Sequence, residues 1–316
     1  MASIDRRERV EEALERSLIA IPSLNGAHLL QRMLPTLRVP GRIVVVLDQG
    51  SSDDTAAVCA RHGAEILQLG SPRTYTEACN AGIALARSRG CEFVFLSNND
   101  IAFTTDVTRE LLGELLEDPD LGIVAPSQVI VDPSTGKRRL SCRSYWDLRK
   151  PKFAHDYAPT PLGVRRLEAD FCELTFALAR VDVLERVGGL DNDYGFYHED
   201  ADLGFRLREA GYACAYLPQS QIEHYAGSTF SGQSDRRAAY LQRSKEIFAR
   251  KHLGYGVSLG DAREGQLREY LRRYRLLRDG APQLSVIAPG VGGVPMGVET
   301  DVFHPWGPAL ELAERP

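Results

Sequence analysis

The stretch FVFLSNND, residues 93–100, joins a strongly apolar run to polar side chains at its carboxyl end. The apolar run indicates a strand that is buried on both faces of a sheet. An aspartate at the end of such a strand, here Asp100, has the position and the chemistry to hold a divalent metal. About a hundred residues later, YHEDADL (residues 197–203) places several acids at what we expect to be the start of a helix. One of these carboxylates, brought opposite Asp100, could accept a proton.

The pattern around residues 93–100 is repeated along residues 18–126. We expect strands at 18–21, 43–47, 65–69, 92–96 and 122–125, with helices at 28–37, 53–62, 74–89 and 106–117. Alternating strands and helices predict an α/β fold, with a mostly parallel sheet covered by helices on both faces. Ligands of such sheets bind beyond the carboxyl ends of the strands, where Asp48 and Asp100 fall.

The pattern is looser in the second half of the chain. Residues 126–163 are rich in Pro, Arg and Lys and predict a hairpin and a loop. We then expect a strand at 170–179, a short helix at 181–187, the acidic helix at 198–210 and a strand at 213–217. Helices are predicted at 234–252 and 261–278.

Composition excludes several classes of protein. The 316 residues carry 38 basic and 43 acidic side chains, and a net charge of −5 does not suit a nucleic-acid partner. The six cysteines are scattered without a CxxC pair, which disfavours a zinc site or a disulfide framework. No run approaches the roughly 18 uncharged apolar residues of a membrane span, and the charged N-terminus lacks an apolar signal core. We expect a cytoplasmic location, with peripheral attachment at the inner face of the plasma membrane left open.

Taken in order, these motifs resemble the inverting family 2 glycosyltransferases, which use nucleotide sugars and have the GT-A fold. The likeness is greatest to rhamnosyltransferase-like members and covers roughly residues 17–255. It is carried by AIPSLNG (20–26), VLDQGSSDDT (46–55), ACNAGI (78–83), FLSNND (95–100), RVGGLD (186–191), YHEDADLGFR (197–206) and HYAGS (224–228).

The resemblance implies a nucleotide site built from the ends of the first strands. It implies that the backbone around Pro22, Ser23 and Asn25 lines the base and that Asp48 contacts it, with Gln49 where many relatives have a second Asp. Arg73 and Arg243 are candidates to neutralise the diphosphate, and solvated surface arginines are the equal alternative. The remaining substrate-binding candidates are Asn80, Asn98, Asn99, Asp191 and Glu199.

The same resemblance implies the metal site and the catalytic base. Asp100 and His224 are the expected ligands of Mg²⁺ or Mn²⁺, and Asn98 departs from the Asp-x-Asp motif of the family. Asp200 is the expected base that deprotonates the acceptor hydroxyl. The alternative explanation of the acids around Asp200 is that acidic residues are enriched at helix N-termini because of the helix dipole.

We therefore expect an inverting, metal-dependent glycosyltransferase that moves rhamnose or a hexose from a nucleoside diphosphate sugar to a hydroxyl of a glycan or lipid-linked glycan acceptor. Cell-surface polysaccharide or glycolipid synthesis is the expected context. A non-catalytic nucleotide-sugar-binding module that scaffolds a glycan synthase complex is the alternative, and Asn98 gives it some support. An NAD-dependent oxidoreductase is disfavoured, because residues 22–26 stand where GxGxxG would be needed.

The resemblance also sets the expected domain organisation. Residues 1–16 form a charged segment, and residues 17–255 form the transferase domain, with a nucleotide-binding half (17–126) and an acceptor and catalytic half (127–255). Residues 256–316 are expected to be a helical extension and a tail. The tail faintly resembles a piece of family 4 glycosyltransferases, so a further transferase module, like a homo-oligomer, is left open.

Two accessory segments suggest further contacts. Residues 137–152 hold seven basic residues and one Asp, with Tyr145 and Trp146 between them. Aromatic faces stack on sugars and the charges suit an acidic acceptor, although a solvated loop has the same composition. The predicted helix at 261–278 has apolar residues at helical spacing among arginines, which suits an anionic membrane surface or, as we favour, its own domain.

Overall fold

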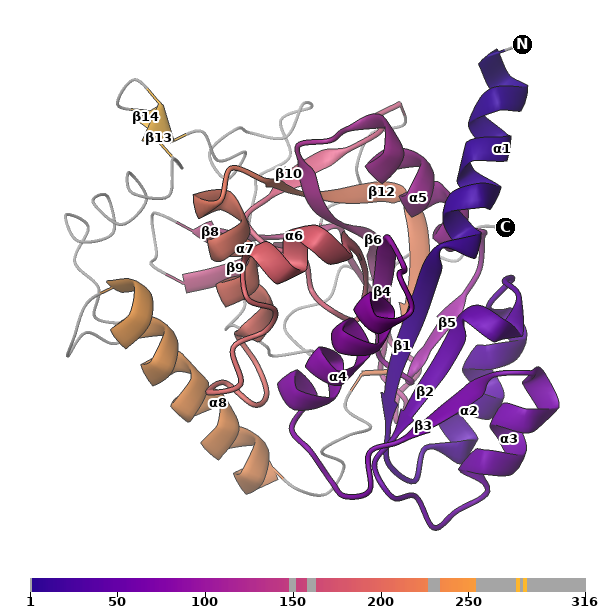
Figure 1. The fold of residues 1–316 in the computed structure, drawn as a ribbon. Coiled ribbons are helices and arrows are strands. Elements are labelled where there is room, and N and C mark those ends of the chain that lie inside the picture. Colours follow the sequence, from indigo (N-terminus) through magenta and orange to yellow (C-terminus); the bar gives the residue numbers. More distant parts are fainter. Residues whose placement is uncertain are drawn as a thin grey trace.

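The computed structural model describes residues 2–147, 152–157, 163–226 and 234–253, together with two short strands at 277–278 and 281–282. Figure 1 shows a central twisted sheet with helices packed against both of its faces. The predicted α/β class is confirmed. Within the described part of the chain, no helix is both long enough and apolar enough to cross a membrane.

Ten strands form the main sheet, in the order β10-β12-β6-β11-β4-β1-β2-β3, with β5 beside β12 and β7 beside β6. Neighbours β3, β2, β1 and β4 are parallel. Strand β11 runs antiparallel to both β4 and β6, so β6 and its parallel neighbour β12 share the direction of β4. The bounds are β1 (Ser17–Ser23), β2 (Val44–Asp48), β3 (Glu65–Gln68), β4 (Phe93–Ser97), β5 (Ile101–Phe103), β6 (Leu121–Val131), β7 (Arg138–Ser141), β10 (Leu167–Ala169), β11 (Phe176–Arg180) and β12 (Ala213–His224).

Helices cover the two faces of the sheet and bury two separate apolar cores. Along β1, Ile19 and Ile21 point into one core, while Leu18 and Ala20 point into the other, as the two-residue alternation of a strand requires. The first core is covered by α1 (Ala2–Glu15), α2 (Ala27–Met33), α3 (Thr55–His62) and α5 (Val107–Glu117). The second is covered by α4 (Tyr75–Ser88), α6 (Val181–Arg186) and α7 (Glu199–Glu209), and α8 (Ser234–Phe248) follows later in the chain.

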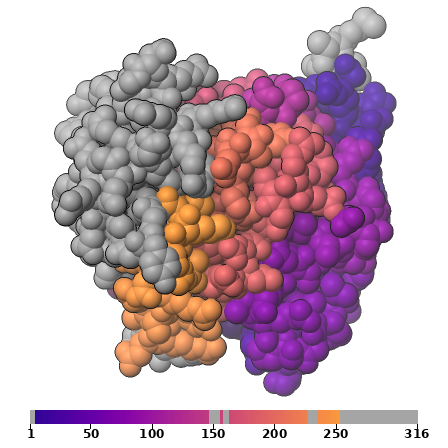
Figure 2. All heavy atoms as spheres, turned by 60° about the vertical axis from the view of Figure 1, so that its left-hand side comes forward, coloured from indigo at the N-terminus to yellow at the C-terminus, as the bar shows by residue number. Residues whose placement is uncertain are grey.

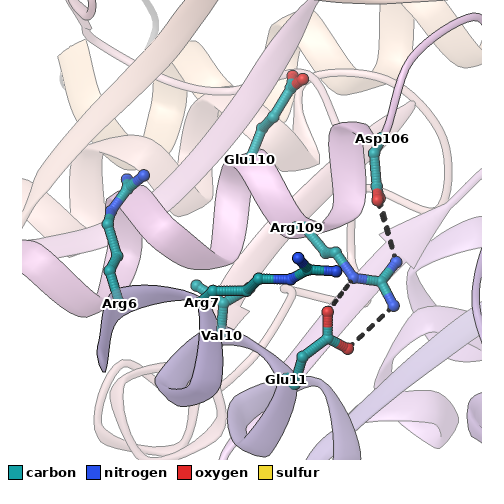
Figure 3. Close-up of a pocket in the computed structure, with 7 residues that line it drawn as sticks. All are labelled: Arg6, Arg7, Val10, Glu11, Asp106, Arg109 and Glu110. Atoms are coloured by element: carbon teal, nitrogen blue, oxygen red, sulfur yellow. Dashed lines mark hydrogen bonds and ion pairs between the residues drawn. The ribbon is translucent and has the colours of Figure 1, made fainter. Parts of the chain in front are cut away.

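The charged N-terminal segment is helix α1, which the sequence did not reveal. Val10 and Leu14 are buried in the first core. The polar side of α1 is tied to α5, because Arg109 bridges Glu11 and Asp106 (Figure 3). Residues 2–15 therefore pack as part of the same folded unit as the sheet.

Four expected elements have clearly different bounds in the structure, and two of them are shorter than expected. The helix expected at 28–37 ends at Met33 and continues as a single 3₁₀ turn, since Pro35 cannot donate a helical hydrogen bond. The strand expected at 170–179 begins only at Phe176. Before it, the backbone is held by side chains, as where the Glu173 N–H donates to the Tyr216 hydroxyl at 2.8 Å.

The strands expected to end at 125 and 217 run on to Val131 and His224. They pair in parallel, and the ladder changes register just after Leu217 pairs with Pro126. An irregularity of this kind lets a sheet accommodate proline. The extension matters because it places the far ends of β6 and β12 beside the site described next.

The accessory segments are only partly described. Residues 143–147 and 152–156 form the hairpin strands β8 (Arg143–Asp147) and β9 (Lys152–Asp156). The helix expected at 261–278 lies outside the described residues except for its last two positions. The prediction is wrong at these two positions, because Leu277–Arg278 (β13) is a strand that pairs with Ala281–Pro282 (β14). The tail at 285–305 lies outside the described residues.

Candidate active site

A cleft of about 690 Å³ lies where the carboxyl ends of the central strands meet the start of α7. Both halves of the chain line it, from the turn after β1 to residues of α8. This is the edge of a parallel sheet at which ligands are expected. Asp100 and Asp200 both line this one cleft.

The turn after β1 forms one wall and is held by neighbouring loops. Ser23 accepts a hydrogen bond from the Asn99 side-chain amide at 3.1 Å, and its carbonyl accepts from the Gln49 N–H at 3.0 Å. The Gln49 side chain in turn accepts from the Arg73 backbone N–H at 2.7 Å. A Cβ at Gly26 would lie 2.3 Å from the Ser23 hydroxyl and 2.6 Å from the Asn99 amide nitrogen, so a larger residue here would displace these two side chains. The wall is thus fixed before any ligand binds.

Asp100 and His224 meet because strands β5 and β12 pair. His224 stands opposite Ile101 in that antiparallel ladder, and the Tyr225 N–H donates to the Asp100 carbonyl at 2.9 Å. The imidazole Nε2 lies 3.5 Å from Asp100 Oδ1, beyond the usual hydrogen-bond distance. Burial alone would lower the pKa of His224, but the Asp100 carboxylate outweighs it, and the pKa is raised.

These two side chains supply only part of the ligand set of a divalent cation. Asp100 Oδ1 is buried beside His224 and accepts no hydrogen bond, so its lone pairs are available to a cation. Among the described residues no three His, Cys, Asp or Glu side chains gather closely enough to hold a metal by themselves. Mg²⁺ and Mn²⁺ commonly take one or two protein ligands and complete their shell with water and substrate phosphates. The donor set therefore suits such a cation.

The start of helix α7 forms the opposite wall. Tyr197 and His198 precede the helix with φ of 68° and 63°, a left-handed conformation that is uncommon for residues with side chains. Strain of this kind is concentrated at functional sites. The next residues are Glu199 and Asp200, which are both buried although they line the cleft.

Burial changes the acid–base properties of this pair. It raises the pKa of Asp200 to about 7, and the negative charge of Glu173 adds to the effect. The pKa of Glu199 is raised further, mainly by burial and then by the charge of Asp200. The Ala201 N–H donates to the Asp200 carboxylate at 2.7 Å, which keeps this side chain at the helix N-terminus. A buried carboxyl with a pKa near neutrality is suited to accepting a proton.

Most of the residues expected at the site line the cleft together. They are Pro22, Ser23, Asn25, Gln49, Arg73, Asn98, Asn99, Asp100, Glu199, Asp200 and His224.

Four expected site residues are not among those lining the cleft. Asp48 is buried, and its carboxylate accepts a hydrogen bond from the Ser51 hydroxyl. Asn80 holds the turn before α7 through the backbone of Leu190 at 2.8–2.9 Å. Asp191 forms an ion pair with Lys251, and Arg243 is exposed on α8.

Several lining residues were not predicted. Gln128 comes from the extended part of β6, and its strand was expected to end before it. Arg236 and Arg237 of α8 line the cleft where Arg243 had been expected. In the basic segment, Tyr145 is buried and is not among the residues that line the cleft. Arg139 does line the cleft, as does Tyr157, and the Arg139 guanidinium lies 4.2 Å from the centre of the Tyr157 ring.

The family described as Glycosyltransferase like family 2 matches residues 16–241. A rhamnosyltransferase of Mycobacterium tuberculosis, N-acetylglucosaminyl-diphospho-decaprenol L-rhamnosyltransferase, is 26% identical over 264 residues, which are 75% of this chain and 85% of that protein. The succinoglycan biosynthesis protein ExoA of Rhizobium meliloti is 25% identical over 66% of this chain and 63% of its own.

Among solved structures, GalNAc-T7 with UDP, GalNAc and Mn²⁺ is similar in fold, with a TM-score of 0.57 and 13% sequence identity. The similarity covers 82% of this chain and 54% of that one, so this chain spans about half the length of GalNAc-T7. The likeness supports the GT-A fold.

Proposed function

The chain belongs to the family 2 glycosyltransferases, and from that premise we propose that it transfers a sugar from a nucleoside diphosphate sugar to a glycan hydroxyl with inversion at the anomeric carbon. The observation that carries the proposal is the shared cleft. Asp100 and His224 lie in the same cavity as the buried carboxyl of Asp200. This arrangement has a place for a diphosphate and a base for a hydroxyl.

The donor would bind across the carboxyl ends of β1, β2 and β4. The turn containing Ser23 and Asn25 is braced against Gln49 and Arg73, so it offers a rigid surface for the base. The structure of GalNAc-T7, which is similar in fold, contains UDP, which supports a nucleotide as a ligand of this chain.

Asp100 and His224 would hold the divalent cation, Mg²⁺ or Mn²⁺, with the donor phosphates completing its shell. When bound, such a cation supplies positive charge to the leaving diphosphate. The Mn²⁺ of the GalNAc-T7 structure supports this assignment. Asn98, in place of an acid, lowers the negative charge that this wall offers to the cation.

Asp200 would accept the proton of the acceptor hydroxyl. As the proton leaves, the hydroxyl oxygen attacks the anomeric carbon from the face opposite the diphosphate. The bond between that carbon and the diphosphate oxygen breaks, and the nucleoside diphosphate departs with the electron pair. The configuration is inverted because the new bond forms opposite the old one.

For the substrates we propose rhamnose or a hexose as the donor sugar and a glycan or lipid-linked glycan as the acceptor. The name of the mycobacterial relative, which acts on a diphospho-decaprenol, supports a lipid-linked acceptor. We propose that the enzyme works in cell-surface polysaccharide or glycolipid synthesis, at the inner face of the membrane. Residues 17–255 would form the transferase domain, with helix α1 packed onto it, and residues 256–316 would extend it.

The test measures nucleoside diphosphate release from a panel of nucleotide sugars with Mn²⁺ and lipid-linked or free glycan acceptors. Asp200→Asn should lower kcat by about 10²- to 10⁴-fold, the usual contribution of a general base. Glu209→Gln is the matched control, because this exposed acid lies at the other end of the same helix. Full transfer by a folded Asp200→Asn variant would refute the assignment of the base. Nucleotide-sugar binding without any release above background would instead favour the scaffolding module.

A further inference from the structure

A chain of side chains runs from the candidate cation site into the wall of the cleft. His224 Nδ1 lies 2.9 Å from the side-chain oxygen of Gln128. The amide nitrogen of Gln128 donates to Glu173 Oε2. The other carboxylate oxygen, Glu173 Oε1, lies 3.2 Å from His155 Nδ1. These contacts link the ring that faces Asp100 to His155, another residue that lines the cleft.

The polarity of this chain is fixed by its chemistry. A carboxylate only accepts hydrogen bonds, so the group that Gln128 presents to Glu173 must be its NH₂. The amide oxygen of Gln128 is then directed at His224, and this oxygen also only accepts. The proton of a neutral His224 must therefore lie on Nδ1. The lone pair is left on Nε2, 3.5 Å from the unbonded Oδ1 of Asp100.

The sheet holds these groups in place. Gln128 pairs with Ile222 in the parallel ladder of β6 and β12, and His224 lies two residues further along β12. Residues two apart on a strand project from the same face, so Gln128 and His224 are diagonal neighbours. Gln128 is 2% exposed, and the Glu173 side chain is 13% exposed. Both have few other positions to adopt.

We propose that Gln128 and Glu173 are positioning residues that keep His224 in the Nδ1–H form with its Nε2 lone pair facing the cation site. The inference rests on the proposed function, because the site is the one assigned to the divalent cation. Outer hydrogen bonds of this kind fix the tautomer and the orientation of metal-binding histidines, and their loss commonly costs 10- to 100-fold in metal affinity. Neither residue needs to touch the cation to act in this way.

The first experiment measures Mn²⁺ binding by the free protein, from the electron paramagnetic resonance signal of unbound Mn²⁺ at pH 8. Gln128→Met keeps the length of the side chain and removes its amide, and should raise the Kd by about 10- to 100-fold. Ser144→Ala is the matched control. It removes a hydrogen-bond partner of another buried histidine, His155, at 2.9 Å, without interrupting the path to Asp100. It should leave the Kd for Mn²⁺ unchanged.

The second experiment needs no metal. Long-range ¹⁵N–¹H spectra of the histidine side chains at pH 8, with the His224 signals assigned by their loss in His224→Asn, should show the proton on Nδ1. Gln128→Met should lose this preference. Glu173→Gln should weaken it, because an amide at position 173 no longer dictates which way Gln128 faces. This variant also serves if Gln128→Met does not fold.

The outcomes separate the two proposals. A wild-type His224 with its proton on Nε2, or unchanged Mn²⁺ affinity in a folded Gln128→Met variant, would overturn the positioning role while leaving sugar transfer untouched. Absence of sugar transfer, with the Nδ1–H form and the loss of Mn²⁺ binding both observed, would overturn the proposed reaction and leave the positioning role intact.

Discussion

At the scale of single residues, burial decides how the carboxyl groups of the cleft behave. Asp200 and Glu199 occupy neighbouring positions in the first turn of α7, where the helix dipole favours negative charge. Both nevertheless have raised pKa values, because removal from water outweighs the dipole, with a smaller contribution from the charge of Glu173 on Asp200 and from that of Asp200 on Glu199. These two buried acids therefore differ in their acid–base chemistry from exposed acids at a helix N-terminus.

The raised pKa of Asp200 predicts a pH dependence of the reaction. A general base must be deprotonated, so kcat/KM should rise with pH through about 7 and then level off. An exposed aspartate would give a flat profile down to about pH 4. The pH–rate profile measures this directly, and Glu173→Gln should shift the rise to lower pH, since it removes a nearby negative charge. A wild-type profile that is flat between pH 5 and 8 would contradict the prediction.

At the scale of elements, the acidic helix α7 is linked to residues 251 and 252 through one buried carboxylate, that of Asp202. Asp202 is fully buried and contacts Arg206, Lys251 and His252 at 2.7 Å each. Figure 2 shows the orange surface of α8 bordering the salmon surface that contains this helix. Lys251 and His252 lie in the helical turn Ala249–Leu253 that follows α8, and α8 contributes residues to the cleft, so the contact ties two walls of the site together.

Asp202→Asn should lower the free energy of unfolding by about 3–5 kcal/mol, because it removes the carboxylate that pairs with the largely buried Arg206 and the buried His252. Urea denaturation at pH 7 measures this. The exposed Asp120, changed to Asn, is the control and should stay within about 0.5 kcal/mol of wild type. An equally small effect of Asp202→Asn would show that the contact contributes little.

The same carboxylate predicts a loss of stability in acid. Burial alone would raise the pKa of Asp202, but the hydrogen bond from His252 and the nearby cations outweigh it, and the pKa is lowered. A carboxylate with a lowered folded-state pKa stabilises the protein above its unfolded pKa of about 3.9, and this contribution is lost as the pH falls further. The difference in free energy of unfolding between wild type and Asp202→Asn should therefore become smaller below pH 4.

At the scale of the whole molecule, the cleft is formed where the two halves of the chain meet. The first half supplies the turn after β1 and Asp100, while the second supplies Asp200 and His224. Helix α7 approaches its neighbours closely, since a Cβ at Gly204 would lie 2.5 Å from the Asp170 carbonyl. A ligand in this cleft contacts both halves and should stabilise the molecule as a unit.

A nucleoside diphosphate at about 100 times its Kd should stabilise the folded state by about 2.7 kcal/mol. For a domain of this size that corresponds to a rise in Tm of about 5–10 °C. The thermal shift should require Mn²⁺ and be reversed by EDTA, and Asp100→Ala should lose the metal-dependent part. NADH, as a control, should give no shift. An identical shift with EDTA and with Mn²⁺ would contradict the role given to Asp100.

The sequence by itself determined the α/β class, the alternation of strands and helices from β1 to α5 apart from the short strand β5, and the motifs that converge on the cleft. Local patterns suffice there, because apolar periodicity sets each element and the carboxyl ends of parallel strands must share one edge of the sheet. The family resemblance added Asp200 as the base and His224 as a partner of Asp100, and the fold brings all three into one cavity.

Only the tertiary structure decided how far β6 and β12 extend and which side chains lie beside His224. Gln128 lies beyond a proline that ended the predicted strand, and its pairing with β12 joins residues about a hundred positions apart. Helix α1 was likewise predicted only as a charged segment, because its few apolar side chains matter only when α5 lies opposite them. Contacts between distant segments depend on packing and burial of the whole chain, which no local pattern encodes.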